Sequence, residues 1–213
     1  RNINSHGGIK KALFGFFVGV GKSFAYFRNH LLGLYPEFAR RSRILEVLAS
    51  IVPFILLAPF YGLGDVLVFG KIKQKLGGCF IAGISGGGAL PSAVDKFFGA
   101  LGILVLEAYG LTETAPAIAS RLQRKPVTGT VGPALEGTEV KIVGERGETL
   151  PFGHQGIIKV RGPQVMKGYY KKPELTAKVL DAEPWLDTGD LGMLTKKGEI
   201  KITGRAKDTI VLL

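Results

Sequence analysis

The chain has 213 residues, of which 46% are hydrophobic and 21% are charged, and this composition excludes a wholly disordered protein. The net charge is +11, and the single cysteine, Cys79, excludes an internal disulfide framework and any multi-cysteine zinc or iron–sulfur site. We expect Cys79 to be a small residue of the core.

The first 75 residues hold most of the excess positive charge, with 11 Lys and Arg against 3 Asp and Glu. Residues 9–48 are predicted to be helical, and residues 9–28 are apolar and aromatic with cations as their only charges. Such a segment indicates an anionic partner, which could be a membrane lipid, a nucleic acid or a phosphorylated ligand. Long aliphatic runs lie between the cations and no nucleic-acid motif accompanies them, so we expect no nucleic acid.

Residues 47–64 contain no charged side chain, and these 18 residues are at the lower limit for a membrane span. Pro53 and Pro59 would kink or break a helix there unless neighbours satisfy the freed carbonyls. Three interpretations stay open: a spanning helix, a segment in the membrane interface or in a re-entrant hairpin, and a buried apolar stretch. The chain starts at Arg1 and ends on an apolar run, so we expect it to be a piece of a longer protein.

The next part of the chain alternates short strands and helices. A buried strand is predicted at residues 79–84, a glycine loop at 85–91, a helix at 92–101, a second strand at 103–106 and a second loop at 109–114. This order is typical of a βαβ unit in a parallel sheet. Ligands bind beyond the carboxyl ends of such strands, where both loops fall.

The part from residue 127 to residue 204 changes to short strands separated by glycine turns. The predicted strands are residues 139–143, 156–161, 190–194 and 199–203. One helix is expected near residues 173–180, since Pro173 suits a first helical turn. The predicted fold class is α/β, with part of a parallel α/β subdomain followed by a small antiparallel β subdomain.

The two loops of the α/β part carry groups that suit a nucleotide. The loop at 85–91 has three glycines, which let a backbone approach a flat or anionic ligand, although a tight crossover turn would also use them. In the second loop Tyr109 can stack on a base and Thr112 can bond a phosphate oxygen. Glu113 can hold Mg²⁺, which takes few protein carboxylates, although a solvated loop acid is the alternative.

Two later motifs add to these groups. The sequence Asp-Thr-Gly-Asp at residues 187–190 could present a carboxylate at the start of a strand to a ribose diol, or form an Asx turn at the entry of the strand. The sequence Gly-Arg-Ala-Lys-Asp at residues 204–208 could present cations to a nucleotide, or form a polar turn.

Together these motifs resemble those of the AMP-binding, adenylate-forming superfamily, which includes acyl-CoA synthetases, peptide-synthetase adenylation domains and beetle luciferases. The resemblance covers about residues 70–213. It rests on Tyr-Gly-Leu-Thr-Glu-Thr at 109–114, Gly-Thr-Val-Gly-Pro at 129–133, Arg-Gly-Pro-Gln-Val-Met-Lys-Gly-Tyr at 161–169, Trp-Leu-Asp-Thr-Gly-Asp at 185–190 and Gly-Arg-Ala-Lys-Asp at 204–208. The variant Ser-Gly-Gly-Gly-Ala-Leu-Pro loop is most similar to that of a long-chain fatty acid–CoA ligase.

The resemblance implies roles for individual residues. The residues implied to bind the nucleotide are Gly87, Gly88, Ala89, Tyr109, Gly110, Thr112, Asp190 and Arg205. Tyr109 would stack on adenine, and Asp190 would bind the ribose hydroxyls with Arg205. Thr112 would contact the α-phosphate, and Glu113 would hold Mg²⁺, so these two are the implied catalytic residues.

The implied activity is that of an enzyme using ATP, Mg²⁺ and coenzyme A. A fatty carboxylate would attack the α-phosphate to give acyl-AMP and pyrophosphate, and coenzyme A would then take the acyl group. The alternatives are another acyl-adenylating enzyme, such as one that loads a carrier protein, and a non-catalytic membrane-interaction module. We expect a cytoplasmic protein with peripheral contact to the inner face of a membrane.

Composition, the predicted elements and the resemblance together predict a division into segments. Residues 1–70 are basic, apolar and mainly helical, 71–126 form the α/β nucleotide-binding part, 127–204 form the β-rich subdomain, and 205–213 lead to a further domain, with Lys207 at the hinge. The phosphate loop and the catalytic lysine of the family are not found in this sequence, so we expect the isolated chain to be inactive.

Overall fold

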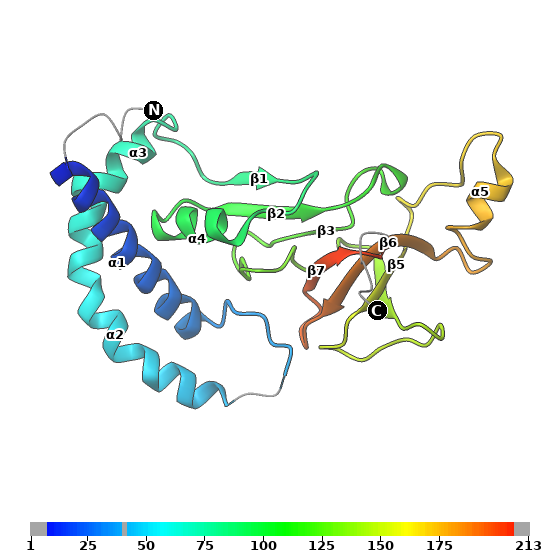
Figure 1. Ribbon diagram of the computed structural model, residues 1–213, viewed down its shortest axis with the longest axis horizontal. Coiled ribbons are helices and arrows are strands. Elements are labelled where there is room, and N and C mark those ends of the chain that lie inside the picture. The colour runs from blue at the N-terminus through cyan, green and yellow to red at the C-terminus, as the bar shows by residue number, and fades with distance from the viewer. Residues whose placement is uncertain (1–7, 40–41, 207–213) are drawn as a thin grey trace. The chain divides into compact units, whose positions relative to one another are not determined.

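The computed structural model describes residues 8–39 and 42–206, which form two compact units (Figure 1). The described residues of the first unit are 8–35, 42–83 and 90–105. Those of the second unit are 36–39, 84–89 and 106–206. The division of the chain at residues 70, 126 and 204 stays a prediction.

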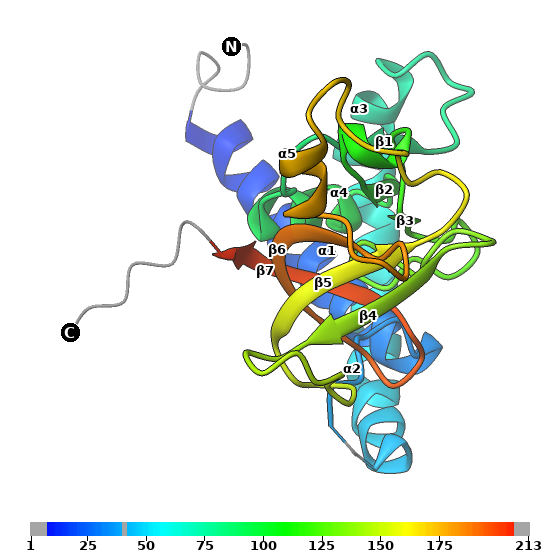
Figure 2. The same ribbon diagram turned by 90° about the vertical axis from the view of Figure 1, so that its right-hand side faces the viewer.

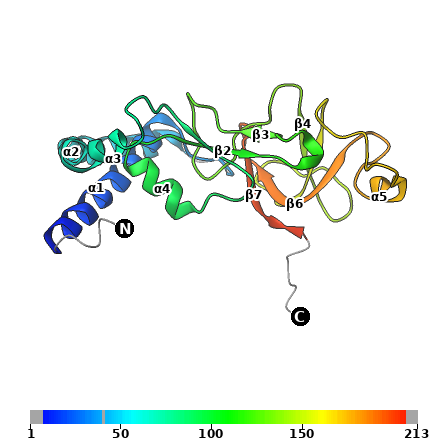
Figure 3. The same cartoon turned by 90° about the horizontal axis from the view of Figure 1, so that it is seen from above.

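Helices make up the first unit. The long helices α1 (Gly8–Leu32) and α2 (Arg43–Gly64) lie side by side, and α4 (Ser92–Ala100) also packs on α1 (Figures 1 and 3). Gly21 allows the α1–α4 approach, because a Cβ atom at Gly21 would lie 2.5 Å from the carbonyl oxygen of Ala100. The core of this unit consists of Phe17, Val18, Phe69, Ala100, Leu101 and Ile103.

Helix α2 passes through Pro53 and Pro59 without ending. It continues into a π-helical turn, Asp65–Phe69, and then into α3 (Gly70–Gln74). Of the residues predicted to be helical, 9–48, the structure has helix at 9–32 and 43–48, whereas residues 33–39 are not helical. Helix α2 itself contributes only Ser50 and Gly64 to the buried residues. Large apolar side chains along α2 are exposed: Ile44, Leu45, Leu48, Ile51, Val52, Ile55, Leu56, Phe60 and Leu63.

The continuous helix Arg43–Gln74 has the length and apolar composition that a membrane span needs. Among the described residues it is not a buried core helix, because most of its apolar stretch is exposed. Residues 47–64 are therefore mostly not buried by the described part of this chain, which leaves open the two membrane interpretations and burial against residues outside it.

The smaller sheet has the strand order β1 (Gly83–Ser85), β2 (Val105–Tyr109) and β3 (Ala119–Ser120). The prediction of a buried strand at residues 79–84 is wrong: the strand begins at Gly83, and Phe80, Ile81 and Ile84 are exposed. Because β1 is at the edge of this sheet, strand neighbours cover it on one side only. Cys79 lies in the same segment. The prediction that it belongs to the core is also wrong, since Cys79 is exposed.

The larger sheet is antiparallel throughout, in the order β4 (Glu139–Val143), β5 (Gly156–Arg161), β6 (Leu186–Leu194) and β7 (Ile200–Arg205) (Figure 2). In β5 and β6, buried residues alternate with less buried ones, as the period-two pattern predicts, whereas in β4 and β7 they do not. That core contains Tyr109, Ile118, Ala119, Val131, Ile142, Ile158, Val160, Leu186 and Ile200. The predicted α/β class, with a parallel-containing sheet followed by an antiparallel sheet, is confirmed.

The short helix α5 (Pro173–Ala177) separates β5 from β6 and begins with Pro173 in its first turn, as expected. Strand β6 differs from its prediction because it begins four residues earlier, at Leu186 rather than at Asp190. The Asp-Thr-Gly-Asp motif at 187–190 therefore lies inside a strand and not at its entry.

Segment 131–134 ties the two sheets of the second unit together. The Val131 amide donates to the Ile200 carbonyl at 2.8 Å, and Ala134 pairs with Ala119 of β3. This segment contains the last three residues of the Gly-Thr-Val-Gly-Pro motif at 129–133. It therefore links β3 of the smaller sheet to β7 of the larger one.

A buried ion pair reinforces the same region. Arg121 Nη2 lies 2.8 Å from Glu107 Oε2, with 1% and 12% of the two side chains exposed, and Arg121 Nε donates to the Thr130 carbonyl at 2.6 Å. No local sequence pattern indicates this pair, because its residues come from β2 and from the segment after β3. Removal of one partner would leave a buried charge, which is strongly destabilising.

Candidate functional site

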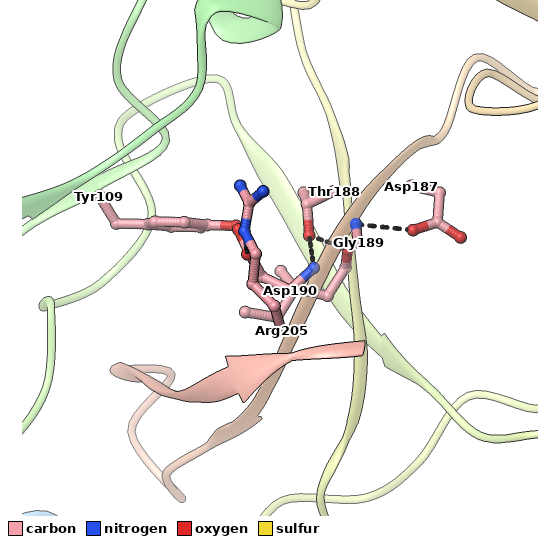
Figure 4. Close-up of polar contacts among 7 residues, drawn as sticks. Tyr109, Asp187, Thr188, Gly189, Asp190 and Arg205 are labelled. Carbon is pink, nitrogen blue, oxygen red and sulfur yellow. Dashed lines mark hydrogen bonds and ion pairs between the residues drawn. The ribbon is translucent and has the colours of Figure 1, made fainter. Parts of the chain in front are cut away.

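Tyr109, Asp190 and Arg205 come together from three strands, although they are far apart in the sequence (Figure 4). The Tyr109 hydroxyl donates to Asp190 Oδ2 at 2.7 Å, and Arg205 Nε donates to Asp190 Oδ1 at 2.9 Å. Asp190 is 5% exposed, whereas the Arg205 side chain is 59% exposed. The buried carboxylate therefore holds a partly exposed guanidinium at the surface of the second unit.

The backbone around Asp190 is fixed by its own motif. Gly189 has a φ of +68°, which favours glycine, and its amide donates to Asp187 Oδ1 at 2.8 Å. Thr188 Oγ1 donates to the Ile158 carbonyl of β5 at 2.8 Å and accepts from the Asp190 amide at 3.1 Å (Figure 4). The Asx turn weighed for this motif is thus formed by Asp187, while Asp190 faces Tyr109 and Arg205.

Tyr109 differs from its expected position in a loop. It is the last residue of β2, it belongs to the core, and it is 7% exposed. Burial raises the pKa of Tyr109 far above its ordinary value; the hydrogen bond with Thr188 lowers it in part, and the Asp190 carboxylate raises it further, so the phenol stays protonated and donates to Asp190. The hydroxyl contact with Asp190 is a feature that the sequence analysis did not anticipate.

The residues after Tyr109 form a tight turn. Thr112, Glu113 and Thr114 make one turn of 3₁₀-helix, capped by Thr114, whose hydroxyl accepts from the Leu111 amide at 3.0 Å. Glycine is required at position 110 because the backbone there lies close to Pro116: a Cβ atom would lie 1.6 Å from the carbonyl oxygen of Pro116. The turn leaves Thr112 exposed and Glu113 half-buried.

A second chain segment reaches Glu113. The Tyr169 hydroxyl donates to Glu113 Oε1 at 2.8 Å, and the Met166 amide donates to the Glu113 carbonyl at 2.8 Å. The hydrogen bond to the carboxylate, more than burial, raises the pKa of Tyr169. No role for Tyr169 could be predicted from the sequence, since 56 residues separate the two side chains and no local signal relates them.

Glu113 has the donor chemistry of a magnesium–nucleotide site. Among the described residues there is no group of three or more His, Cys, Asp or Glu side chains that could hold a metal ion by themselves. A single half-buried carboxylate fits a cation that takes its other ligands from phosphates and water, as Mg²⁺ does. It does not fit an all-protein metal cage.

The glycine loop lies next to the same strand. Gly87 has a φ of +79°, and Gly87, Gly88 and Ala89 are exposed. A Cβ atom at Gly86 would lie 3.6 Å from the Ala108 carbonyl, so the loop passes along β2 one residue before Tyr109. Exposed backbone at this point is compatible with approach by a flat ligand. The predicted hinge residue Lys207 lies outside the described residues.

Comparisons with known proteins agree with these motifs. A family model described as AMP-binding enzyme matches residues 23–170. Probable acyl-activating enzyme 16, chloroplastic, of Arabidopsis thaliana is 49% identical over 77% of this chain and 24% of its own length. A chloroplastic long-chain-fatty-acid–[acyl-carrier-protein] ligase of the same plant is 48% identical over 74% of this chain and 23% of its own length. The medium-chain fatty-acid–CoA ligase of Escherichia coli (strain K12) is 42% identical over 60% of this chain and 23% of its own length.

Solved structures give the same relationship. ATP-bound MatB from Rhodopseudomonas palustris has a TM-score of 0.57 and 38% identity, over 60% of this chain and 26% of that chain. The o-succinylbenzoate coenzyme A synthetase of Bacillus subtilis, in complex with ATP and magnesium ion, has a TM-score of 0.55 and 30% identity, over 61% of this chain and 27% of that chain. The chain spans about a quarter of the length of the curated relatives it matches. It belongs to the AMP-binding enzyme family, whose matching members are acyl-activating and fatty-acid ligases.

Proposed function

We propose that this chain is part of an ATP-dependent long-chain fatty acid ligase that forms an acyl adenylate and passes the acyl group to coenzyme A. The observation that carries the proposal is the joining of Tyr109, Asp190 and Arg205 into one hydrogen-bonded cluster at the end of β2, the strand that leads directly to Thr112 and Glu113. These are the residues that the family resemblance assigns to the nucleotide.

Asp190 is suited to bind ribose hydroxyls. Each carboxylate oxygen has two lone pairs, so the bonds from Tyr109 and Arg205 leave one acceptor position on each oxygen. Two neighbouring acceptors match the two donors of a ribose diol. The Tyr109 hydroxyl keeps the carboxylate in place, and the resemblance assigns its ring, although it is only 7% exposed, to the contact with adenine.

Thr112 and Glu113 would act at the phosphates. The exposed Thr112 hydroxyl can donate to an α-phosphate oxygen, and the Glu113 carboxylate can hold Mg²⁺. Mg²⁺ neutralises phosphate charge during attack by the fatty carboxylate. Fixed donors aimed at developing charge are the main source of rate enhancement in reactions of this kind.

The acceptor of the acyl group is the part of the proposal that most needs a test. A carrier protein is the second candidate, because the plant relative named as an acyl-carrier-protein ligase is 48% identical, against 42% for the bacterial CoA ligase. We expect the full-length protein that carries this chain to release AMP with a C16 fatty acid, ATP and Mg²⁺ and to form a thioester with coenzyme A. Mass spectrometry of parallel reactions with coenzyme A and with acyl carrier protein identifies the acceptor. Thioester formation on carrier protein alone would replace coenzyme A in the proposal, and no fatty-acid-dependent AMP release with either acceptor would refute it.

We also propose that the helical part contacts an anionic membrane peripherally. This proposal is supported by exposed apolar side chains on α2 and by the cations Lys10, Lys11 and Lys22 of α1. Aromatic side chains favour the interface and cations favour anionic headgroups, at about 1 kcal/mol for each cation near the surface. A fatty acid partitions into bilayers, so this surface would bring the enzyme to its substrate. Cytoplasmic localisation at the inner face of a membrane stays a prediction.

Vesicle co-sedimentation tests this contact. We expect the full-length protein to bind vesicles containing phosphatidylserine at low salt, and to be released at high salt because screening weakens the headgroup contacts. Replacing Leu48 and Leu56, both exposed on α2, by serine should weaken binding, whereas a serine at the exposed Leu122 of the second unit should not. Absence of binding at low salt would refute the proposal. Binding that survives both high salt and alkaline carbonate would point to insertion of α2.

A further inference from the structure

The segment between β5 and α5 contains one side chain that contacts Glu113, the candidate metal ligand. Tyr169 comes from this segment, and its hydroxyl lies 2.8 Å from Glu113 Oε1. The Met166 amide holds the carbonyl of the same glutamate at 2.8 Å. Both the backbone and the carboxylate of Glu113 are therefore bound by a segment more than 50 residues away.

The backbone on either side of Tyr169 is held in place. The Tyr169 amide donates to Thr176 Oγ1 at 2.9 Å, and the Thr176 hydroxyl donates to the Lys172 carbonyl at 3.0 Å. Gly168 has a φ of +144° and passes so close to Thr176 that a Cβ atom would lie 2.8 Å from its methyl group. Lys171 adopts a left-handed φ of +53°, which is uncommon for a residue with a side chain. The position of the Tyr169 ring is therefore fixed by a hydrogen-bonded turn with close backbone contacts.

We propose that Tyr169 is a positioning residue that orients the Glu113 carboxylate toward Mg²⁺. The inference rests on the proposed function, since it takes Glu113 as the metal ligand. Carboxylates that bind metals are themselves hydrogen-bonded by outer partners, which fix their orientation, and loss of such a partner typically weakens metal binding 10- to 100-fold. The hydrogen bond from Tyr169 occupies one lone pair of Oε1, so Oε2 and the second lone pair of Oε1 remain for the cation.

The chain offers a matched control in the next residue. Tyr170 has the same side chain but is 85% exposed, and its ring lies 5.3 Å from Lys171 Nζ, a contact that phenylalanine would keep. Tyr169→Phe and Tyr170→Phe each remove one phenol oxygen from the same turn. A difference between the two variants therefore reports the bond to Glu113.

The experiment measures the Mg²⁺ concentration that half-saturates binding of a non-hydrolysable ATP analogue to the full-length protein, by calorimetry or by Mn²⁺ competition in electron paramagnetic resonance. We expect Tyr169→Phe to raise this concentration about 10-fold, with nucleotide binding restored at saturating Mg²⁺. Tyr170→Phe should leave it unchanged. In the Glu113→Gln background, Tyr169→Phe should add nothing, because the two residues act through one carboxylate.

Three results would overturn the inference. An unchanged Mg²⁺ requirement in Tyr169→Phe would show that the bond does not position the ligand, and a lower requirement would show that Tyr169 competes with the cation. Equal weakening of nucleotide binding at all Mg²⁺ concentrations would show that the bond between Tyr169 and Glu113 stabilises the local structure and does not orient the metal ligand. Failure of the proposed metal role is distinct, since Glu113→Gln would then leave the Mg²⁺ dependence unchanged.

Discussion

Replacement of Glu113 by glutamine should lower fatty-acid-dependent AMP release by the full-length protein about 100- to 1,000-fold. Glutamine keeps an oxygen that can accept from Tyr169, so the local fold is preserved while the negative charge is removed. Loss of a carboxylate that holds the catalytic cation removes several kcal/mol of transition-state stabilisation, and each factor of ten corresponds to about 1.4 kcal/mol. Steady-state rates at saturating ATP measure the effect.

The matched control for this prediction is Glu136→Gln. Glu136 is an exposed acid in the segment before β4, and surface substitutions of this kind change stability by only about 0.5 kcal/mol or less. We expect its rate to equal that of the parent protein. Similar rates for the Glu113 and Glu136 variants would remove Glu113 from the proposed metal site.

Gly110→Ala should destabilise the second unit by on the order of 3 kcal/mol or more, at the upper end for an added methyl group. A Cβ atom at Gly110 would meet the backbone carbonyl of Pro116 at 1.6 Å, so β2 and the turn after it would have to separate. The displacement would move both Tyr109, which precedes Gly110, and Glu113, which lies in the turn. Denaturant unfolding of the full-length protein measures the loss of stability, and binding of an ATP analogue should fall in parallel.

Gly99→Ala is the control for the added methyl group. Gly99 lies inside α4, and no heavy atom lies within 4 Å of a Cβ atom built there. Alanine in an open helical position stabilises by roughly 0.5–1 kcal/mol relative to glycine. If the two variants unfolded at the same denaturant concentration, the close approach at Gly110 would not be a constraint on the fold.

Local sequence patterns determined the elements whose signals are short-range. The bounds of β4 and β5 agree with the predicted strands, because alternating side chains and glycine turns define them within five or six residues. Helix α5 begins at Pro173 as expected, because the ring fixes a dihedral angle that suits a first helical turn. The order of motifs along the chain was likewise sufficient to indicate the AMP-binding family.

The same patterns failed where burial depends on what covers a segment. Residues 79–84 are apolar and were predicted to form a buried strand, but the strand there is short and lies at a sheet edge. Apolar composition indicates that a segment prefers burial, and it does not identify the neighbours that provide it. The exposed apolar face of α2 is a second case, because the 18 uncharged residues fit several environments equally well.

Only the tertiary structure decided how the site is assembled. Tyr109 and Asp190 are 81 residues apart, Glu113 and Tyr169 are 56 apart, and neither bond leaves a trace in local periodicity. These contacts depend on the register of β6 against β5 and β7, and on the turn that presents Tyr169 to Glu113. The sequence by itself determined which chemical groups the site contains, because those are residue identities in recognisable motifs. Their partners were decided by the fold, because a hydrogen bond forms only where packing brings a donor and an acceptor within about 3 Å.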